Sequence, residues 1–112
     1  MNGRMDMEFY RDADGSPRVR AGRLCETLGR FLEEDLQESA DFCRAVLGAI
    51  DDVSAGRILS WEETGNAHTL ALSPDRAVIE SNFDPGAKPC LLELACIKDV
   101  VNAWLEFVQE PA

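Results

Sequence analysis

The residues from Trp61 to Phe83 constrain the fold of this chain most strongly, because they have the pattern of a β-meander. Residues 69–72 alternate small or polar side chains with leucine, which is the period of a strand with one buried face. Residues 73–76 (Ser-Pro-Asp-Arg) supply turn chemistry, since proline fixes φ at the first turn position. Residues 77–83 alternate again. The stretch therefore predicts a β-hairpin.

Further turn signals extend this strand pattern in both directions. The sequence Thr-Gly-Asn at 64–66 predicts a second turn, and with it a third strand over Ile58–Glu63. Near the start of the chain, Met7–Arg11 and Pro17–Arg20 flank a turn rich in aspartate and glycine, so they predict another hairpin. Proline cannot donate to a strand ladder, which places the second of these strands at an edge or gives it Pro17 as its first residue.

Two regions have helical periodicity. Ala21–Ala55 carries an apolar face that predicts either one long helix or two helices with a break near Gln37–Ser39. We favour the break, because one helix of that length would far exceed the usual ~11–12 residues. Ser39 is suited to cap a second helix and Gly56 to end it. Ala95–Gln109 predicts the last helix, with Trp104 on its apolar stripe.

These elements predict one α+β domain spanning residues 1–112. The expected order is β-β-α-β-β-β-α, an antiparallel sheet with helices packed on one face. Cys90–Leu94 reads as either a short strand or the lead-in to the last helix.

Composition limits the possible partners. The formal net charge is −10 and the pI is about 4.4, which disfavours binding to nucleic acid or to an anionic membrane. Met1–Arg11 lacks the apolar core of a signal peptide, and no apolar run approaches the roughly 20 residues of a membrane span. The separations of the four cysteines match no zinc pattern. We therefore expect a cytoplasmic protein with reduced thiols, in which Cys25 and Cys43 lie on the buried faces of helices.

No catalytic signature is present. His68 is the only histidine, and its position two residues before Leu70 favours a hydrogen-bonded structural role. A Cys/His pair would need a cysteine beside it, and Cys90 is the candidate that the last predicted strand offers. The sequence contains neither of the glycine-rich phosphate-loop patterns GxGxxG and GxxxxGK[ST]. We expect no enzyme activity, no cofactor and no metal.

Acidic side chains form the stronger feature. Five carboxylates occur between Glu33 and Asp41 with no basic residue among them. From Leu24 to Glu63, ten acidic residues stand against three arginines. One interpretation is a solvated helix face whose acids lie near a helix start, where the helix dipole favours them. The other is a docking surface for a basic protein.

Several segments resemble a known group of proteins. The residues concerned are Phe9 and Tyr10 in the first hairpin, Trp61 before the Gly65-Asn66 turn, the strand beginning Thr69-Leu70, the return strand Val78–Glu80, and Trp104 three residues before Phe107. In these features the chain resembles immunity proteins of contact-dependent growth inhibition toxin systems, and the related YacL-like proteins.

The resemblance implies a cytoplasmic inhibitor that binds one cognate bacterial toxin domain, commonly a basic nuclease. It agrees with an acidic surface that covers the toxin's active site. The alternative is a YacL-like cytosolic protein of unknown role that binds another basic partner. We expect a monomer or a weak dimer, and the predicted contact residues are Glu33, Glu34, Glu38 and Asp41, with Glu62 and Glu63 as a second patch.

Overall fold

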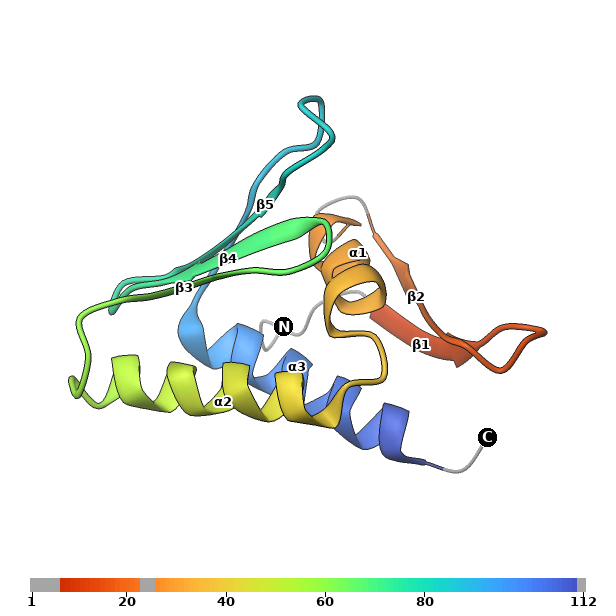
Figure 1. Ribbon diagram of the computed structural model, residues 1–112, viewed down its shortest axis with the longest axis horizontal. Helices are drawn as coiled ribbons and strands as arrows, with labels where there is room; N and C mark the ends of the chain where they lie inside the picture. Colours follow the sequence, from red (N-terminus) through yellow and green to blue (C-terminus); the bar gives the residue numbers. More distant parts are fainter. Residues whose placement is uncertain (1–6, 23–25, 111–112) are drawn as a thin grey trace.

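The computed structural model describes residues 7–22 and 26–110. Its strands and helices follow one another in separate runs, and every strand pairing is antiparallel, which confirms the α+β class (Figure 1). In chain order they are β1 Met7–Arg11, β2 Pro17–Ala21, α1 Glu26–Phe31, η2 Leu32–Leu36, α2 Ala40–Ser54, β3 Trp61–Thr64, β4 His68–Leu72, β5 Ala77–Ser81, β6 Cys90–Leu92 and α3 Leu94–Gln109.

The meander forms an antiparallel sheet in the order β3-β4-β5-β6. The predicted turn between β4 and β5 closes through hydrogen bonds between Ser73 and Arg76, with N···O distances of 2.9 and 3.2 Å. The third strand runs over Trp61–Thr64 rather than Ile58–Glu63, and Cys90–Leu92 forms a strand rather than a helix lead-in. The sheet therefore gains a fourth strand.

The helical region breaks where the sequence predicts. Gln37 has a positive φ of 51°, and Ser39 caps α2 by accepting a hydrogen bond from the Phe42 N–H at 3.1 Å. The indole Nε1–H of Trp104 in α3 donates to the Gln37 carbonyl at 2.8 Å, which fixes the break from a distant part of the chain. Gly56, with φ of 77°, follows the end of α2.

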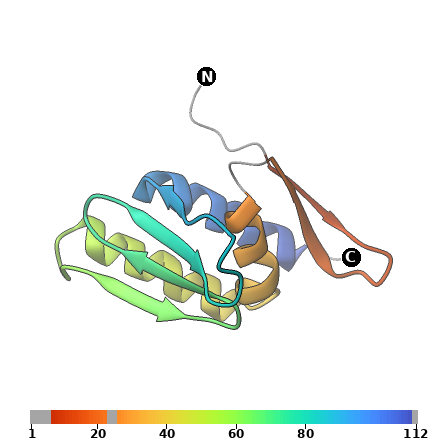
Figure 2. The same cartoon turned by 90° about the horizontal axis from the view of Figure 1, so that it is seen from above.

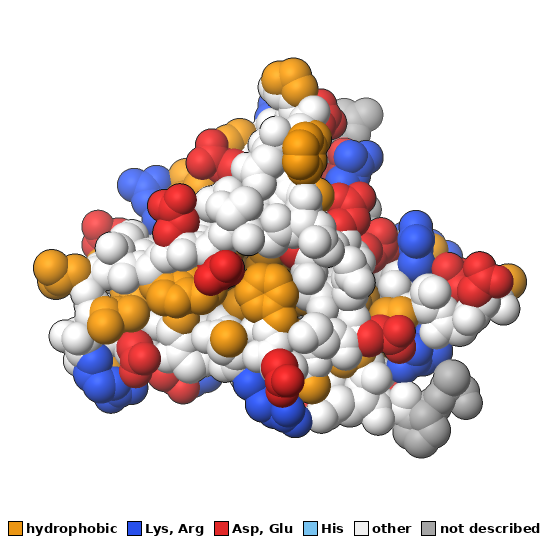
Figure 3. Space-filling model, viewed as in Figure 1, with side chains coloured by type: hydrophobic (Ala, Val, Ile, Leu, Met, Phe, Trp, Pro, Cys, Tyr) orange, Lys and Arg blue, Asp and Glu red, His pale blue; other side chains and the backbone are white. Residues whose placement is uncertain are grey.

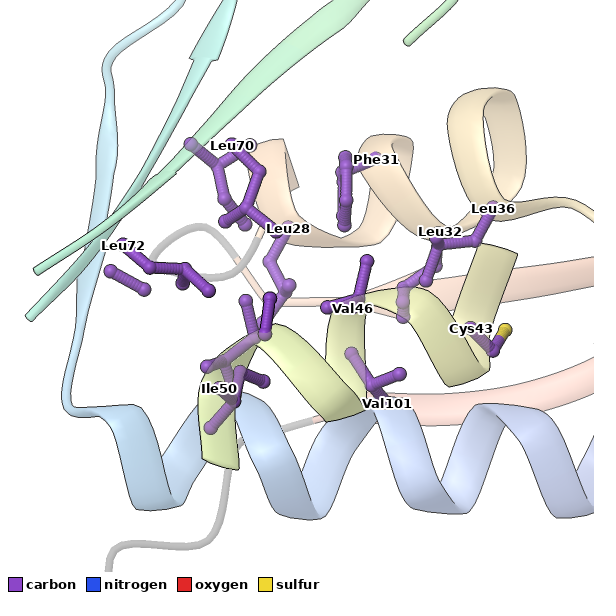
Figure 4. Packing of buried hydrophobic residues seen from close by; sticks show 14 of the residues in the cluster. Leu28, Phe31, Leu32, Leu36, Cys43, Val46, Ile50, Leu70, Leu72 and Val101 are labelled. Carbon is purple, nitrogen blue, oxygen red and sulfur yellow. The ribbon is translucent and has the colours of Figure 1, made fainter. Parts of the chain in front are cut away.

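Helices α2 and α3 form a layer beneath the four-stranded sheet and lie side by side in it, as both views show (Figures 1 and 2). Helix α1 lies above one end of α2, beside the sheet (Figure 1). The apolar faces of α2 and α3 meet the inward-facing leucines of β4 in one core (Figure 4). Trp104 is fully buried there, as its place on the helical stripe predicts. Trp61 is half-buried at the margin of the core.

The first hairpin departs from the predicted single sheet. Strands β1 and β2 pair only with each other, so they form a separate two-stranded sheet. Phe9 stacks edge-on against Trp104 with ring centroids 5.2 Å apart, and Arg11 donates to the Phe107 carbonyl at 3.2 Å. The hairpin therefore packs on the C-terminal half of α3, away from the larger sheet (Figure 2).

Two further expectations concern the thiols and membranes. Cys43 is buried on α2 as predicted, whereas Cys25 lies outside the described residues. No helix within residues 7–22 and 26–110 has the length and apolar character needed to cross a membrane.

Burial gives a test of the packing around Cys43. Removal from water raises the pKa of the Cys43 thiol from 9.0 to about 11. We expect iodoacetamide at pH 8 to leave Cys43 unmodified in the folded protein and to alkylate it in urea, as read by peptide mass spectrometry. Equal alkylation rates with and without urea would contradict this packing.

The raised pKa of Cys43 also predicts that the free energy of unfolding decreases as pH rises from about 9 to about 11, because the unfolded thiol ionises first.

Candidate functional site

The turn η2 carries the most unusual chemistry among the described residues. It is a π-helical turn, in which the Gln37 N–H donates to the Leu32 carbonyl five residues earlier at 2.8 Å. Such turns are rare and occur frequently at functional sites. Here the turn follows α1 directly and presents Glu34 and Asp35, of which Glu34 is half-exposed and Asp35 is buried.

The Asp35 carboxylate is fully enclosed, with a side-chain exposure of 0%. Its Oδ2 accepts from the backbone N–H groups of Ala67 at 3.1 Å and His68 at 2.9 Å. Its Oδ1 lies 2.8 Å from His68 Nδ1. One side chain therefore holds η2 to the turn between β3 and β4.

His68 is equally buried, with 2% of its side chain exposed. Its ring packs edge-on against Phe31, with centroids 6.2 Å apart. The predicted hydrogen-bonded histidine is confirmed, and its partner is Asp35. Glu34 approaches the same ring nitrogen, with its Oε1 3.9 Å from His68 Nδ1.

A cleft of about 720 Å³ opens beside this group, between α1 and the segment that joins β5 to β6. Glu34 and His68 belong to its lining, and strand β6 brings Cys90 to the same opening. The Thr27 hydroxyl donates to the Lys88 carbonyl at 2.8 Å, which connects α1 to the far side of the cleft. The other charged lining residues are Glu26, Arg30, Asp84 and Lys88.

The predicted contact acids on the helical side divide into two groups. Glu34, Glu38 and Asp41 follow one another from η2 into α2 with side-chain exposures of 49, 61 and 102%. We call these three residues the junction acids. Glu33 is only 15% exposed, since it accepts from the Val19 N–H and lies 3.5 Å from Arg18 Nε. It ties the first hairpin to η2.

Glu62 and Glu63 are both exposed, but they do not form one patch. They are neighbours on β3, and successive side chains of a strand point to opposite faces. Glu63 pairs with Leu70, whose side chain faces the helices, whereas Glu62 pairs with Ala71 on the open face. Figure 3 shows acidic side chains over both the sheet and the helix layers, with a hydrophobic band between them.

Sequence reasoning counted Asp35 among the surface acids and missed its pairing with His68. One signal was available, because Asp35 falls seven residues after Leu28 on the apolar face that also includes Phe31 and Leu32. An acid within an apolar stripe requires a buried partner. The only histidine of the chain, on the inward face of a strand, was the available choice.

The geometry at Gly65 gives a test of this arrangement. A Cβ atom there would lie 3.0 Å from Asp35 Cγ and closer still to Oδ2, and the φ angle of Gly65 is not positive. The close approach of the carboxylate alone therefore requires glycine. We expect Gly65→Ala to lower the free energy of unfolding by about 1–3 kcal/mol in urea denaturation.

Gly48→Ala is the matched control. Gly48 lies within α2, and a Cβ atom added there would have no contact within 4 Å. Alanine at this position should raise stability by roughly 0.5–1 kcal/mol, because it restricts the unfolded chain and favours the helix. If Gly65→Ala were as stable as the parent protein, the Asp35 carboxylate would not occupy the position described above.

Known proteins place the chain in a family. Its residues 5–85 match the model of the uncharacterised protein family UPF0231. It is 34% identical over 79 residues to a UPF0231 protein of Shewanella amazonensis, and 32% identical over 78 residues to one of Cronobacter sakazakii. It is 28% identical over 81 residues to the UPF0231 protein YacL of Escherichia coli. Each alignment covers 70% of this chain and 64% of the relative.

The residues that match the family model include Glu34, Asp35, Gly65 and His68. The alignments show that the chain spans about 64% of the length of these relatives. No solved structure matches it. The resemblance to YacL-like proteins is confirmed, whereas the resemblance to toxin-immunity proteins stays a prediction. The chain belongs to the uncharacterised protein family UPF0231.

Proposed function

We propose that this chain is a non-enzymatic binding protein that docks a basic protein through the junction acids Glu34, Glu38 and Asp41. The observation that carries the proposal is the exposure of these three carboxylates. Glu38 and Asp41 form only long ion pairs, with Arg11 at 3.6 Å and Arg44 at 3.8 Å, both longer than a charge-assisted hydrogen bond. Such exposed pairs contribute little to stability, so a partner could replace them.

The charge of the whole chain supports the same proposal. A net charge of −10 attracts basic surfaces over distances up to the Debye length, which is about 10 Å at 0.1 M salt. Such steering speeds encounter and excludes acidic partners. We further propose a cytoplasmic location and a monomeric or weakly dimeric state, since nothing in the proposal needs a membrane, a nucleic acid or a cofactor.

A competing explanation assigns these acids to helix stability. Asp41 lies in the first turn of α2, where the helix dipole favours a carboxylate by roughly 0.3–1 kcal/mol. Under this explanation, reversing the charge would lower stability without affecting any partner. The docking explanation therefore predicts a change in affinity for the partner, whereas the helix explanation predicts a change in the free energy of unfolding.

The partner is best identified by affinity capture from cells at two salt concentrations. We expect one basic protein to remain bound at moderate salt, because a specific interface of about 800 Å² per partner is not held by screened charge alone. Recovery of many abundant basic proteins, all released as salt rises, would contradict the proposal.

With the partner in hand, we expect the double variant Glu38→Lys, Asp41→Lys to weaken binding at least about tenfold, or about 1.4 kcal/mol, in isothermal titration calorimetry. Glu34 is left unchanged because it also approaches His68. The control is Asp75→Lys, Asp99→Lys, which changes the net charge equally at exposed positions elsewhere. Equal weakening by the two double variants would show that only net charge matters.

The narrower form of the proposal makes the partner a bacterial toxin domain encoded beside this chain. An acidic surface is suited to the basic substrate groove of a nuclease, where phosphates would otherwise bind. We expect co-expression to protect cells from that toxin and the double variant Glu38→Lys, Asp41→Lys to protect less. Full binding of a basic partner that has no toxic activity would instead support the broader YacL-like form.

A further inference from the structure

We propose that Glu34, Asp35 and His68 form a binding site for a divalent transition-metal cation at the wall of the cleft. Each residue offers one ligand atom, and the three atoms lie within 4.8 Å of one another. The group combines a ring nitrogen with two carboxylate oxygens, a set that suits Mn²⁺, Fe²⁺ or Zn²⁺. The site shares Glu34 with the junction acids, but cation binding needs no partner protein and can be tested without one.

The two separations from His68 Nδ1 are short enough for one shared cation. Two ligands that each lie roughly 2.1 Å from a metal are at most about 4.2 Å apart. His68 Nδ1 lies 2.8 Å from Asp35 Oδ1 and 3.9 Å from Glu34 Oε1, and all three ligand atoms lie within 4.8 Å of one another. Glu34 would move toward the buried pair to complete the site, and its side chain is 49% exposed and long enough to rotate.

Burial distinguishes this group from an ordinary acidic surface. Asp35 and His68 are 0% and 2% exposed, so neither position is explained by the solubility of a charged face. A cation bound by Nδ1 and Oδ1 would replace the hydrogen bond that joins these two atoms. The third ligand, Glu34, keeps contact with the cleft, which leaves the cation accessible from solvent.

The second oxygen of Asp35 supplies the support that metal ligands usually have. Oδ2 accepts from the backbone N–H groups of Ala67 and His68, and these bonds remain when Oδ1 binds a cation. Such outer contacts fix the orientation of a ligating side chain and strengthen binding. The close packing of Gly65 against the same carboxylate further limits its movement.

The test uses Mn²⁺ and electron paramagnetic resonance, in which the sharp signal of free Mn²⁺ disappears on binding. Mn²⁺ prefers oxygen and nitrogen ligands, so the four cysteines should not contribute. We expect saturation at one equivalent, and the return of the free signal when Zn²⁺ is added as a competitor. Absence of binding by both cations up to about 1 mM, a concentration at which even weak cation sites are occupied, would overturn the proposal.

Glu34→Gln is the main variant, because it removes a ligand charge at a half-exposed position without disturbing the buried pair. We expect it to weaken Mn²⁺ binding at least about tenfold. Glu38→Gln is the control, with the same charge change at an exposed position four residues away. Equal affinities of the two variants would assign the binding to general surface charge and overturn the proposal.

Asp35→Asn is the second variant, and its fold is first checked by circular dichroism. The asparagine can still accept a hydrogen bond, so the turn keeps part of its support while the ligand charge is lost. Loss of Mn²⁺ binding in a folded Asp35→Asn protein is the expected result. Unchanged binding in that protein would exclude the buried pair as the site, whatever the outcome for the docking partner.

Discussion

The arrangement of the helical region against the larger sheet depends on the contacts of the Asp35 carboxylate. This carboxylate joins η2 of the helical region to the turn between β3 and β4 of the sheet through two backbone N–H groups and the His68 ring. Leaving a buried donor without its acceptor costs roughly 1–3 kcal/mol. A charged group at this depth is stable only because each oxygen has partners. The same contact therefore sets the position of Glu34 and of the cleft.

The helical break and the first hairpin follow from this region. The π-helical turn ends at Leu36, and the carbonyl of the next residue, Gln37, accepts from the Trp104 indole in α3. Glu33, on the other side of the turn, accepts from the Val19 N–H and so attaches the hairpin. Segments that are distant in the sequence thus meet around this one turn. A substitution that distorts η2 would therefore disturb its contacts with the sheet, with α3 and with the first hairpin at the same time.

Local patterns predicted the elements well, because strand and helix periods are set by which face is buried. The meander, the Ser39 cap, the break near Gln37 and the core position of Trp104 are all confirmed. The separate first sheet was not predictable, since strand pairing depends on contacts with α3 that no local pattern encodes. The Asp35–His68 pair escaped prediction for a similar reason. Acidic residues near Asp35 in the sequence suggested a surface, whereas its burial depends on a residue 33 positions away.

The edge strands of the larger sheet also limit how this protein can associate with other chains. β3 and β6 are its outer strands, and one is four residues long with Glu62 and Glu63 at its centre, while the other has only three residues. Short or charged edges resist pairing with the strand of another chain, which is the first step of many aggregates. Recognition by strand addition is thereby disfavoured. Glu62 and Glu63 at the β3 edge likewise disfavour pairing between two copies of this chain.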